Sequence, residues 1–193
     1  MRLYLLFVLL SLYPVFTQAT DTVYVHETQL PILIERKDNV FFLMRLTTDE
    51  SDKKLNEVAL QFDSECEFVN IQSVKLYYGG TEARQNYGKD LFAPVVYIPR
   101  NDPGKILAAN RSYSIKKTQV DNPGRKVLLN AGQKLFPEVN YFWISLQMKP
   151  SASLLDKVSA KIVTIKVDNK EALIHTVSSE NITHRVGVGV RHA

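Results

Sequence analysis

The sequence of 193 residues contains a single cysteine, Cys66. One thiol cannot form a disulfide within the chain, and it cannot supply a cysteine-based metal cluster. The chain must therefore be stabilised by an apolar core, for which its length is sufficient. Glu65 and Glu67 flank Cys66 and would raise the pKa of its thiol, so we expect a buried, inert side chain rather than a nucleophile.

The usual sequence signatures of catalysis are also missing. There is no GxSxG segment for a serine nucleophile and no HExxH pair for a metal. The histidines His26, His175, His184 and His192 are widely spaced, and Gly79-Gly80 lacks the lysine and the helix of a phosphate-binding loop. We therefore expect no catalytic residues, no metal site and no cofactor.

Long apolar runs are absent except at the start of the chain. Arg2 precedes an apolar stretch over 3–16, which ends in the small residues of Thr17-Gln18-Ala19. This layout is typical of a signal peptide, and the stretch is shorter than the roughly 20 residues that a membrane-spanning helix requires. We expect a cleaved leader over 1–19, a mature chain from Thr20, a periplasmic or extracellular location and no membrane span.

The sequence also lacks blocks of like charge. Its formal net charge is +4, which falls by one if Arg2 leaves with the leader, and lysines and arginines are scattered among acids. The closest approach to a basic cluster is Lys116-Lys117 with Arg125-Lys126, separated by a turn-like Asp121-Asn122-Pro123-Gly124. A solvated hairpin explains this pattern better than a nucleic-acid surface, so nucleic acid is not an expected partner.

What the sequence has in abundance is short runs of Val, Ile, Tyr and Phe, broken by Gly, Pro, Asn and Asp. Alternation puts Val74, Leu76 and Tyr78 on one face of a strand, and it groups Val163 with Ile165 and Val167. The expected strands are Thr22–His26, Pro31–Arg36, Asn39–Thr47, Glu57–Asp63, Ser73–Tyr78, Val95–Pro99, Ser112–Val120, Lys126–Asn130, Val139–Lys149, Val158–Asp168 and Glu171–His175. Helical periodicity is weak, and the best candidate is one turn near Ala152–Lys157.

Turn residues indicate antiparallel pairing between neighbouring strands. Asp168-Asn169-Lys170 is expected to join two strands tightly, and Asp121-Asn122-Pro123-Gly124 is expected to join another pair. The pattern predicts an all-β fold, an antiparallel β-sandwich or jelly roll of about ten strands. Two long polar stretches, 79–94 and 99–111, interrupt the strands and are the expected places for function.

Aromatic and amide side chains offer a binding chemistry in place of catalysis. Sugars stack their C–H faces on aromatic rings and hydrogen-bond to polar side chains. The candidate carbohydrate-binding residues are Tyr77, Arg84, Gln85, Asn86, Tyr87 and Trp143. The alternative is that Tyr77 and Trp143 cover the second face of a sheet or dock another domain.

Four segments of the chain are specific enough to compare with known families: Ser73–Ala83 (SVKLYYGGTEA), Asn140–Leu146 (NYFWISL), Asp156–Ala160 (DKVSA) with Val167–Lys170 (VDNK), and His184–Arg191 (HRVGVGVR). In this order they resemble the N-terminal domain of secreted bacterial exo-α-sialidases (neuraminidases). The resemblance runs from about Thr22 to the last residue.

The resemblance implies a β-sandwich like that of carbohydrate-binding modules, spanning 20–183, which precedes a six-bladed β-propeller that removes terminal sialic acid. Residues 184–193 resemble the linker and the opening strand of that propeller, which is otherwise missing. The family's arginine triad, RIP motif, SxDxGxTW Asp boxes, Tyr/Glu nucleophile pair and Asp acid/base have no match here. The chain itself is therefore expected not to be an enzyme, although the full-length relative would be a glycoside hydrolase.

Two hypotheses of function follow from the resemblance. In the first, the domain binds sialylated or galactose-containing glycans and holds the sialidase propeller, its partner in cis, near substrate. In the second, it is a structural module that packs on the propeller and stabilises it without binding sugar.

Overall fold

The computed structural model describes residues 21–28, 31–34, 36–81, 115–176 and 184–187, and all structural statements below concern these residues. Within them the chain is built of strands and one short 3-10 turn. The elements are β1 (Thr22–Glu27), β2 (Ile32–Leu33), β3 (Asn39–Thr48), β4 (Lys54–Phe62), the 3-10 turn η1 (Phe68–Asn70), β5 (Ile71–Gly80), β6 (Ile115–Asp121), β7 (Lys126–Lys134), β8 (Glu138–Met148), β9 (Lys157–Val158), β10 (Ala160–Val167), β11 (Lys170–Glu171), β12 (Leu173–Thr176) and β13 (His184–Gly187).

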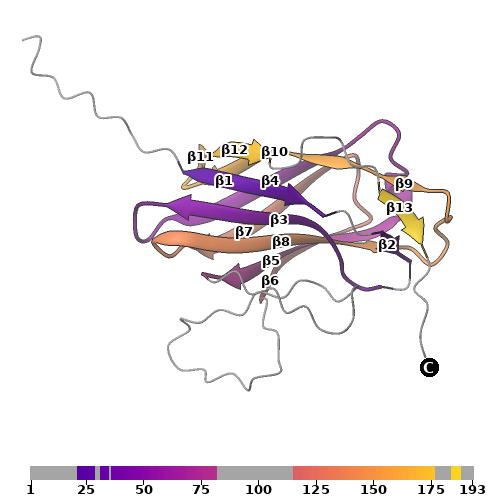
Figure 1. The fold of residues 1–193 in the computed structure, drawn as a ribbon, viewed down its shortest axis with the longest axis horizontal. Coiled ribbons are helices and arrows are strands. Elements are labelled where there is room, and N and C mark those ends of the chain that lie inside the picture. Colours follow the sequence, from indigo (N-terminus) through magenta and orange to yellow (C-terminus); the bar gives the residue numbers. More distant parts are fainter. Residues whose placement is uncertain (1–20, 29–30, 35, 82–114, 177–183, 188–193) are drawn as a thin grey trace, which may run out of the picture.

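The strands form two main sheets that pack face to face (Figure 1). The larger is six-stranded, in the order β12-β1-β3-β8-β5-β6, and the smaller is four-stranded, in the order β11-β10-β4-β7. Neighbours in these sheets are antiparallel except β1 and β12, which are parallel. The predicted all-β sandwich is confirmed.

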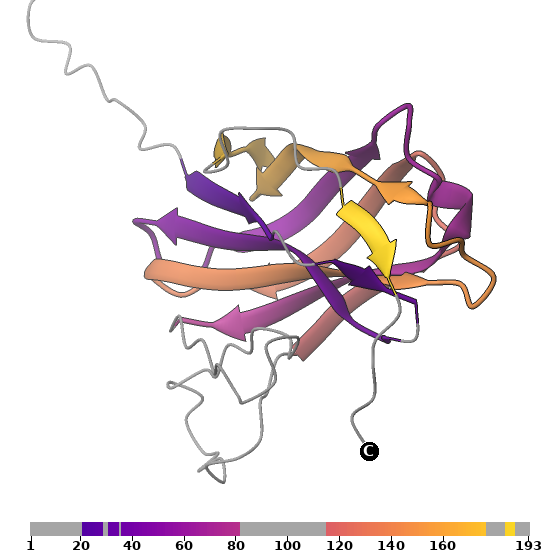
Figure 2. The same ribbon diagram turned by 45° about the vertical axis from the view of Figure 1, so that its right-hand side comes forward.

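A third, three-stranded sheet of β2, β13 and β9 lies at one end of the sandwich, and Figure 2 shows β13 there in yellow. Val186 of β13 is buried in the same core as Ile32 of β2. Residues 184–187, which the resemblance assigned to a linker, thus pair with β2 and β9. The division at residue 183 stays a prediction, and the expected leader, 1–19, lies outside the described residues.

The core between the two main sheets comes from the alternating apolar residues of each strand. Val23, Met44 and Phe142 of the larger sheet face Val58 and Ile165 of the smaller sheet around a common point. All five side chains are at most 2% exposed. Each such side chain contributes about 1.5–3 kcal/mol by leaving water, which is how a chain without disulfides is stabilised.

Most of the expected strands are present, and the differences are local. Pro31–Arg36 shortens to Ile32–Leu33, and Val95–Pro99 lies outside the described residues. The helical turn expected near Ala152–Lys157 is wrong, because that segment forms non-helical turns; the 3-10 turn is η1 instead.

The grouping of Val163 with Ile165 and Val167 is also wrong. A register shift between Ile162 and Thr164 against β4 marks a β-bulge, with Val163 as the extra residue. Val163 is therefore 42% exposed, while Ile165 and Val167 remain in the core. Ile162 packs against the core from the other side of the bulge.

The two expected tight turns have different outcomes. Asp168 and Asn169 join β10 to β11 with φ angles of 48° and 63°, the left-handed pair that a type I′ hairpin requires. The turn 121–124, however, does not join paired strands, since β6 belongs to the six-stranded sheet and β7 to the four-stranded one. It carries the chain from one sheet to the other, so the expected hairpin is wrong at this position.

Candidate functional site

The candidate site lies on the outer face of the six-stranded sheet, meaning the side turned away from the four-stranded sheet. Alternation along β8 puts Tyr141, Trp143 and Ser145 on this face, while Phe142 and Ile144 enter the core. Tyr77 of β5 is the cross-strand partner of Trp143. A second, smaller apolar cluster forms here from Val40 and Trp143, with Leu43, Tyr77 and Tyr141 packed against them.

Tyr77 and Trp143, both predicted as sugar-binding residues, are brought together. Their rings stack with centroids 4.0 Å apart and planes 5° from parallel. Trp143 lies on the outward side, as the alternation predicts, yet only 4% of its surface is exposed. The Trp143 ring is therefore largely covered within this chain, and the pair joins β5 to β8 by aromatic packing.

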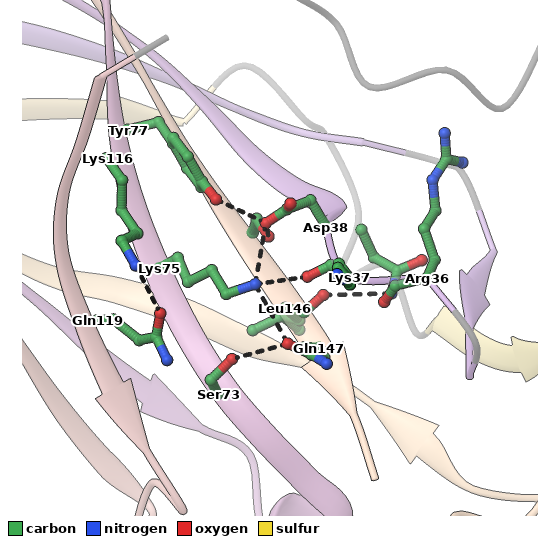
Figure 3. A network of polar contacts seen from close by, with 12 residues as sticks. Arg36, Lys37, Asp38, Ser73, Lys75, Tyr77, Lys116, Gln119, Leu146 and Gln147 are labelled. Atoms are coloured by element: carbon green, nitrogen blue, oxygen red, sulfur yellow. Dashed lines mark hydrogen bonds and ion pairs between the residues drawn. The ribbon is translucent and has the colours of Figure 1, made fainter. Parts of the chain in front are cut away.

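A polar network adjoins this aromatic pair (Figure 3). We call it the Asp38 network; it comprises Asp38, Lys75, Tyr77, Ser145 and Gln147. Asp38 Oδ1 accepts hydrogen bonds from Tyr77 Oη at 2.8 Å, Ser145 Oγ at 2.9 Å and Lys75 Nζ at 3.2 Å. Asp38 directly precedes β3, so these bonds fix the start of that strand over β5 and β8.

Lys75 is only 7% exposed, and a buried ammonium must have partners for its three N–H donors. Nζ donates to the carbonyl oxygen of Lys37 at 2.7 Å, to Asp38 Oδ1 and to Gln147 Oε1 at 3.2 Å. All three donors are thus used inside the fold. The Asp38 network is satisfied by itself and leaves Lys75 no donor for a ligand.

The electrostatics of the network follow from its contacts. Burial by itself would raise the pKa of Asp38, but hydrogen bonds from Tyr77 and Ser145 and the charge of Lys75 outweigh it and lower the pKa below its usual value. Burial, together with the neighbouring carboxylate of Asp38, raises the pKa of Tyr77. Asp38 is accordingly ionised and Tyr77 neutral at physiological pH.

A second row of side chains crosses the same face and was not predicted from the sequence. Tyr24 of β1, Arg45 of β3 and Tyr141 of β8 are direct cross-strand partners, and His175 of β12 is the partner of Tyr24 on the other side. We call these residues the Arg45 row. The signal that could have found it is the period of two, which places Tyr24 opposite the core-facing Val23 and Val25.

The other predicted residues, Arg84, Gln85, Asn86 and Tyr87, lie outside the described residues. Cys66 is 5% exposed, and burial, followed by the charges of Asp63 and Glu67, raises the pKa of its thiol to about 11. Within the described ranges, no three His, Cys, Asp or Glu side chains gather where they could hold a metal ion. No helix in that part of the chain is long and apolar enough to cross a membrane.

Comparison with known proteins identifies the fold. Residues 20–171 match the family described as the N-terminal domain of BNR-repeat neuraminidase. The chain is 58% identical over 191 residues to a sialidase of Bacteroides fragilis (strain YCH46), covering 99% of this chain and 35% of the relative. The solved structure of the Hadza microbial sialidase Hz136 matches 88% of this chain and 32% of its own, with a TM-score of 0.67 and 35% identity.

The chain thus spans about a third of the length of these relatives. The family match covers most of the described strands, from β1 to β11. The chain therefore belongs to the family of N-terminal domains of BNR-repeat neuraminidases.

Proposed function

We propose that the chain is a non-catalytic accessory domain of a sialidase, which binds sialylated or galactose-containing glycans and holds the catalytic propeller near its substrate. A site on an open sheet buries little of a sugar, so the affinity of one site is expected to be weak. A weak site still raises the local substrate concentration when it is linked to a catalytic domain, because the second encounter becomes intramolecular.

The observation that carries this proposal is the composition of the outer face of the six-stranded sheet. Tyr24 of β1 and Tyr141 of β8 lie there in cross-strand register with Arg45. Tyr77 of β5 lies opposite Trp143 on the same face. The outer face of the four-stranded sheet instead carries a Lys166–Glu57 ion pair of 3.2 Å and the exposed aliphatic side chain of Leu128. Rings beside hydrogen-bond donors match the apolar faces and hydroxyl rims of sugars, whereas paired charges are typical of a solvated face.

Titration of the full chain with sialylated and galactose-terminated oligosaccharides tests the proposal directly. We expect binding in the high-micromolar to millimolar range by calorimetry or by NMR shifts. No heat and no shift at millimolar sugar would reject glycan binding. A fluorogenic sialoside incubated with the same chain is expected to release no fluorophore, and turnover would reject the non-catalytic assignment.

A structural role is the second candidate, and the burial of Trp143 favours it. The Tyr77–Trp143 stack and the Asp38 network stiffen the sheet rather than display open rings. A module of this kind would pack on the propeller and stabilise it. Trp143→Ala in the full-length enzyme would then lower its melting temperature while leaving glycan retention unchanged, and the reverse pattern would reject this role.

The proposed location is the periplasm or the extracellular space, where the substrates of such an enzyme occur. The apolar stretch 3–16 followed by Thr17-Gln18-Ala19 supports export by a cleaved leader. N-terminal sequencing of the protein recovered from the exported fraction should begin near Thr20. Retention of Met1 in that fraction would contradict cleavage.

A further inference from the structure

Arg45 stands at the centre of the Arg45 row, between two tyrosines. Directly opposite residues in antiparallel strands have their Cβ atoms about 4.5–5.5 Å apart. Tyr24 and Tyr141, one strand away on either side of Arg45, are therefore roughly 10 Å apart at their Cβ atoms, from two strand spacings of about 4.8 Å each. Arg45 projects from between these two positions, with its guanidinium over the Tyr24 ring, and Tyr141 packs against the cluster of Val40 and Trp143.

Among the described residues, Arg45 forms no ion pair, and Asp38, which lies on the same face, pairs with Lys75. The outward-facing side chains of β1, β3 and β8 in the described chain include no Asp or Glu; both acids of these strands lie elsewhere, with Glu27 buried and Glu138 at the start of β8. The guanidinium carbon instead lies 5.9 Å from the centroid of the Tyr24 ring. A guanidinium stacked on a ring keeps its N–H edge available for a planar anion.

Tyr24 is exposed but held in place, which suits a binding surface. It is 42% exposed, and His175 stacks against it with ring centroids 5.3 Å apart and planes 19° from parallel. Arg45 lies over the same ring. Because contacts with both neighbouring strands already restrict this side chain, a ligand would immobilise little further and would bind at a smaller entropic cost.

The Asp38 network provides the contrast on the same face. Lys75 is another cation there, but its three donors are used by Lys37, Asp38 and Gln147. Lys116, the cross-strand partner of Tyr77 on β6, donates to Gln119 Oε1 at 3.1 Å. Trp143, the largest ring on the face, is only 4% exposed. In the described part of the chain, the Arg45 row therefore offers a ligand an exposed ring, Tyr24, and a cation without an acidic partner, Arg45.

From this arrangement we infer that Arg45 binds the carboxylate of an acidic terminal sugar, with Tyr24 and Tyr141 flanking the sugar ring. The inference rests on the proposed glycan-binding function and adds to it the subsite and the chemical class of its ligand. Guanidinium and carboxylate form two parallel hydrogen bonds that a neutral sugar cannot replace. The domain should therefore discriminate carboxylated sugars from neutral galactosides.

The test compares two ligands that differ by the acidic sugar. The full chain is titrated with lactose and with 3′-sialyllactose whose sialic acid is joined through sulfur, so that hydrolysis cannot enter the measurement. We expect the sialylated ligand to bind about tenfold more tightly or better, the difference that one charge-assisted bidentate contact supplies. Arg45→Gln should abolish this preference, so that both ligands bind the variant with similar Kd values.

A matched control exists at the other end of the sandwich. Arg125 is also exposed and lies over an aromatic ring, with its guanidinium carbon 6.0 Å from the Phe68 centroid, but it is not on the outer face. Arg125→Gln should leave both Kd values unchanged. Arg45→Lys, which keeps the charge without the planar fork, should retain only part of the preference. Circular dichroism and melting curves establish that each variant is folded.

The remaining outcomes show whether the inference alone fails or the proposed function fails with it. Equal binding of both ligands by the unmodified chain, or an unchanged preference in Arg45→Gln, overturns the inference and leaves glycan binding in place. Tighter binding of lactose than of the sialylated ligand does the same. Binding of neither ligand at millimolar concentration rejects the proposed function and the inference together.

Discussion

The carboxylate of Asp38 accepts a 2.8 Å hydrogen bond from the hydroxyl of Tyr77, which belongs to β5, two strands away from β3 in the sheet. The same oxygen atom accepts hydrogen bonds from Ser145 Oγ of β8 and Lys75 Nζ of β5, so the Asp38 side chain holds the start of β3 against these two strands. This contact explains why the Tyr77 ring stands parallel to Trp143: its hydroxyl end and its face are both fixed.

Asp38→Asn should destabilise the fold at neutral pH. The substitution removes the charge that Lys75 pairs with and leaves Tyr77, Ser145 and Lys75 with a poorer acceptor, so we expect a loss of about 1–3 kcal/mol. Urea unfolding at pH 7 measures it. Ser151→Ala, an exposed change away from this network, should have an effect of about 0.5 kcal/mol or less.

The effect of Asp38→Asn should shrink in acid. The pKa of Asp38 is lower in the folded chain than its usual value near 3.9, so its stabilising contribution is present above about pH 4 and is lost as the pH falls through the folded pKa. Unfolding free energies of the two proteins should therefore converge as the pH falls below about 4. A constant difference over that range would contradict a role for the charge.

Trp143→Ala should mainly reduce stability, whereas Tyr24→Ala should mainly reduce glycan binding. Trp143 is 4% exposed, and removal of its ring is expected to cost about 3–5 kcal/mol. Tyr24 is 42% exposed, and its removal should cost about 1 kcal/mol or less. Calorimetric melting together with sugar titration distinguishes them: Trp143→Ala should mainly lower Tm, and Tyr24→Ala should mainly weaken glycan binding. Equal losses of Tm would contradict the assigned burial.

Cys66 should resist alkylation while the chain is folded. Burial raises the pKa of its thiol to about 11, so little of the reactive thiolate is present at pH 8. Labelling with iodoacetamide at pH 8 should be much slower than for a free cysteine, and it should become fast in urea. Rapid labelling of the native protein would contradict the buried position of this thiol.

Asn169→Val should destabilise the β10–β11 hairpin. Asn169 has a φ of 63°, a left-handed conformation that costs a β-branched side chain about 1–2 kcal/mol. Asn169→Gly removes that strain and should preserve or slightly increase the free energy of unfolding. Asn130→Val, an exposed position inside β7 where a β-branched residue is favoured, is the control. Equal effects of Asn169→Val and Asn130→Val would contradict the type I′ geometry.

Local rules were sufficient where one face of a strand meets the core and the other meets water. The alternation of Val74, Leu76 and Tyr78 predicted β5, and Asp168-Asn169 predicted its tight turn, because both depend on neighbours in sequence. The same rule was wrong for Val163, since the bulge that turns it outward depends on the register with β4. It also could not show that the turn 121–124 joins two different sheets.

The candidate site could be predicted only in part, for a similar reason. Sequence placed Trp143 and Tyr77 on the outward side, but their 4.0 Å stack and the burial of Trp143 depend on residues that are far apart in the chain. Arg45 was not identified as a site residue, because a single arginine in a strand does not indicate a binding site. The cross-strand register, which places Tyr24 and Tyr141 beside it, is needed for that.

The amino-acid sequence by itself determined that this protein is an all-β sandwich with a buried thiol, since side-chain alternation and turn chemistry are properties of neighbouring residues. Tertiary structure alone decided which outward side chains are covered and which remain open. Cross-strand register sets the neighbours of each such side chain, and those neighbours decide whether its hydrogen bonds and charge are satisfied within the fold, as for Lys75, or available to a ligand, as for Arg45.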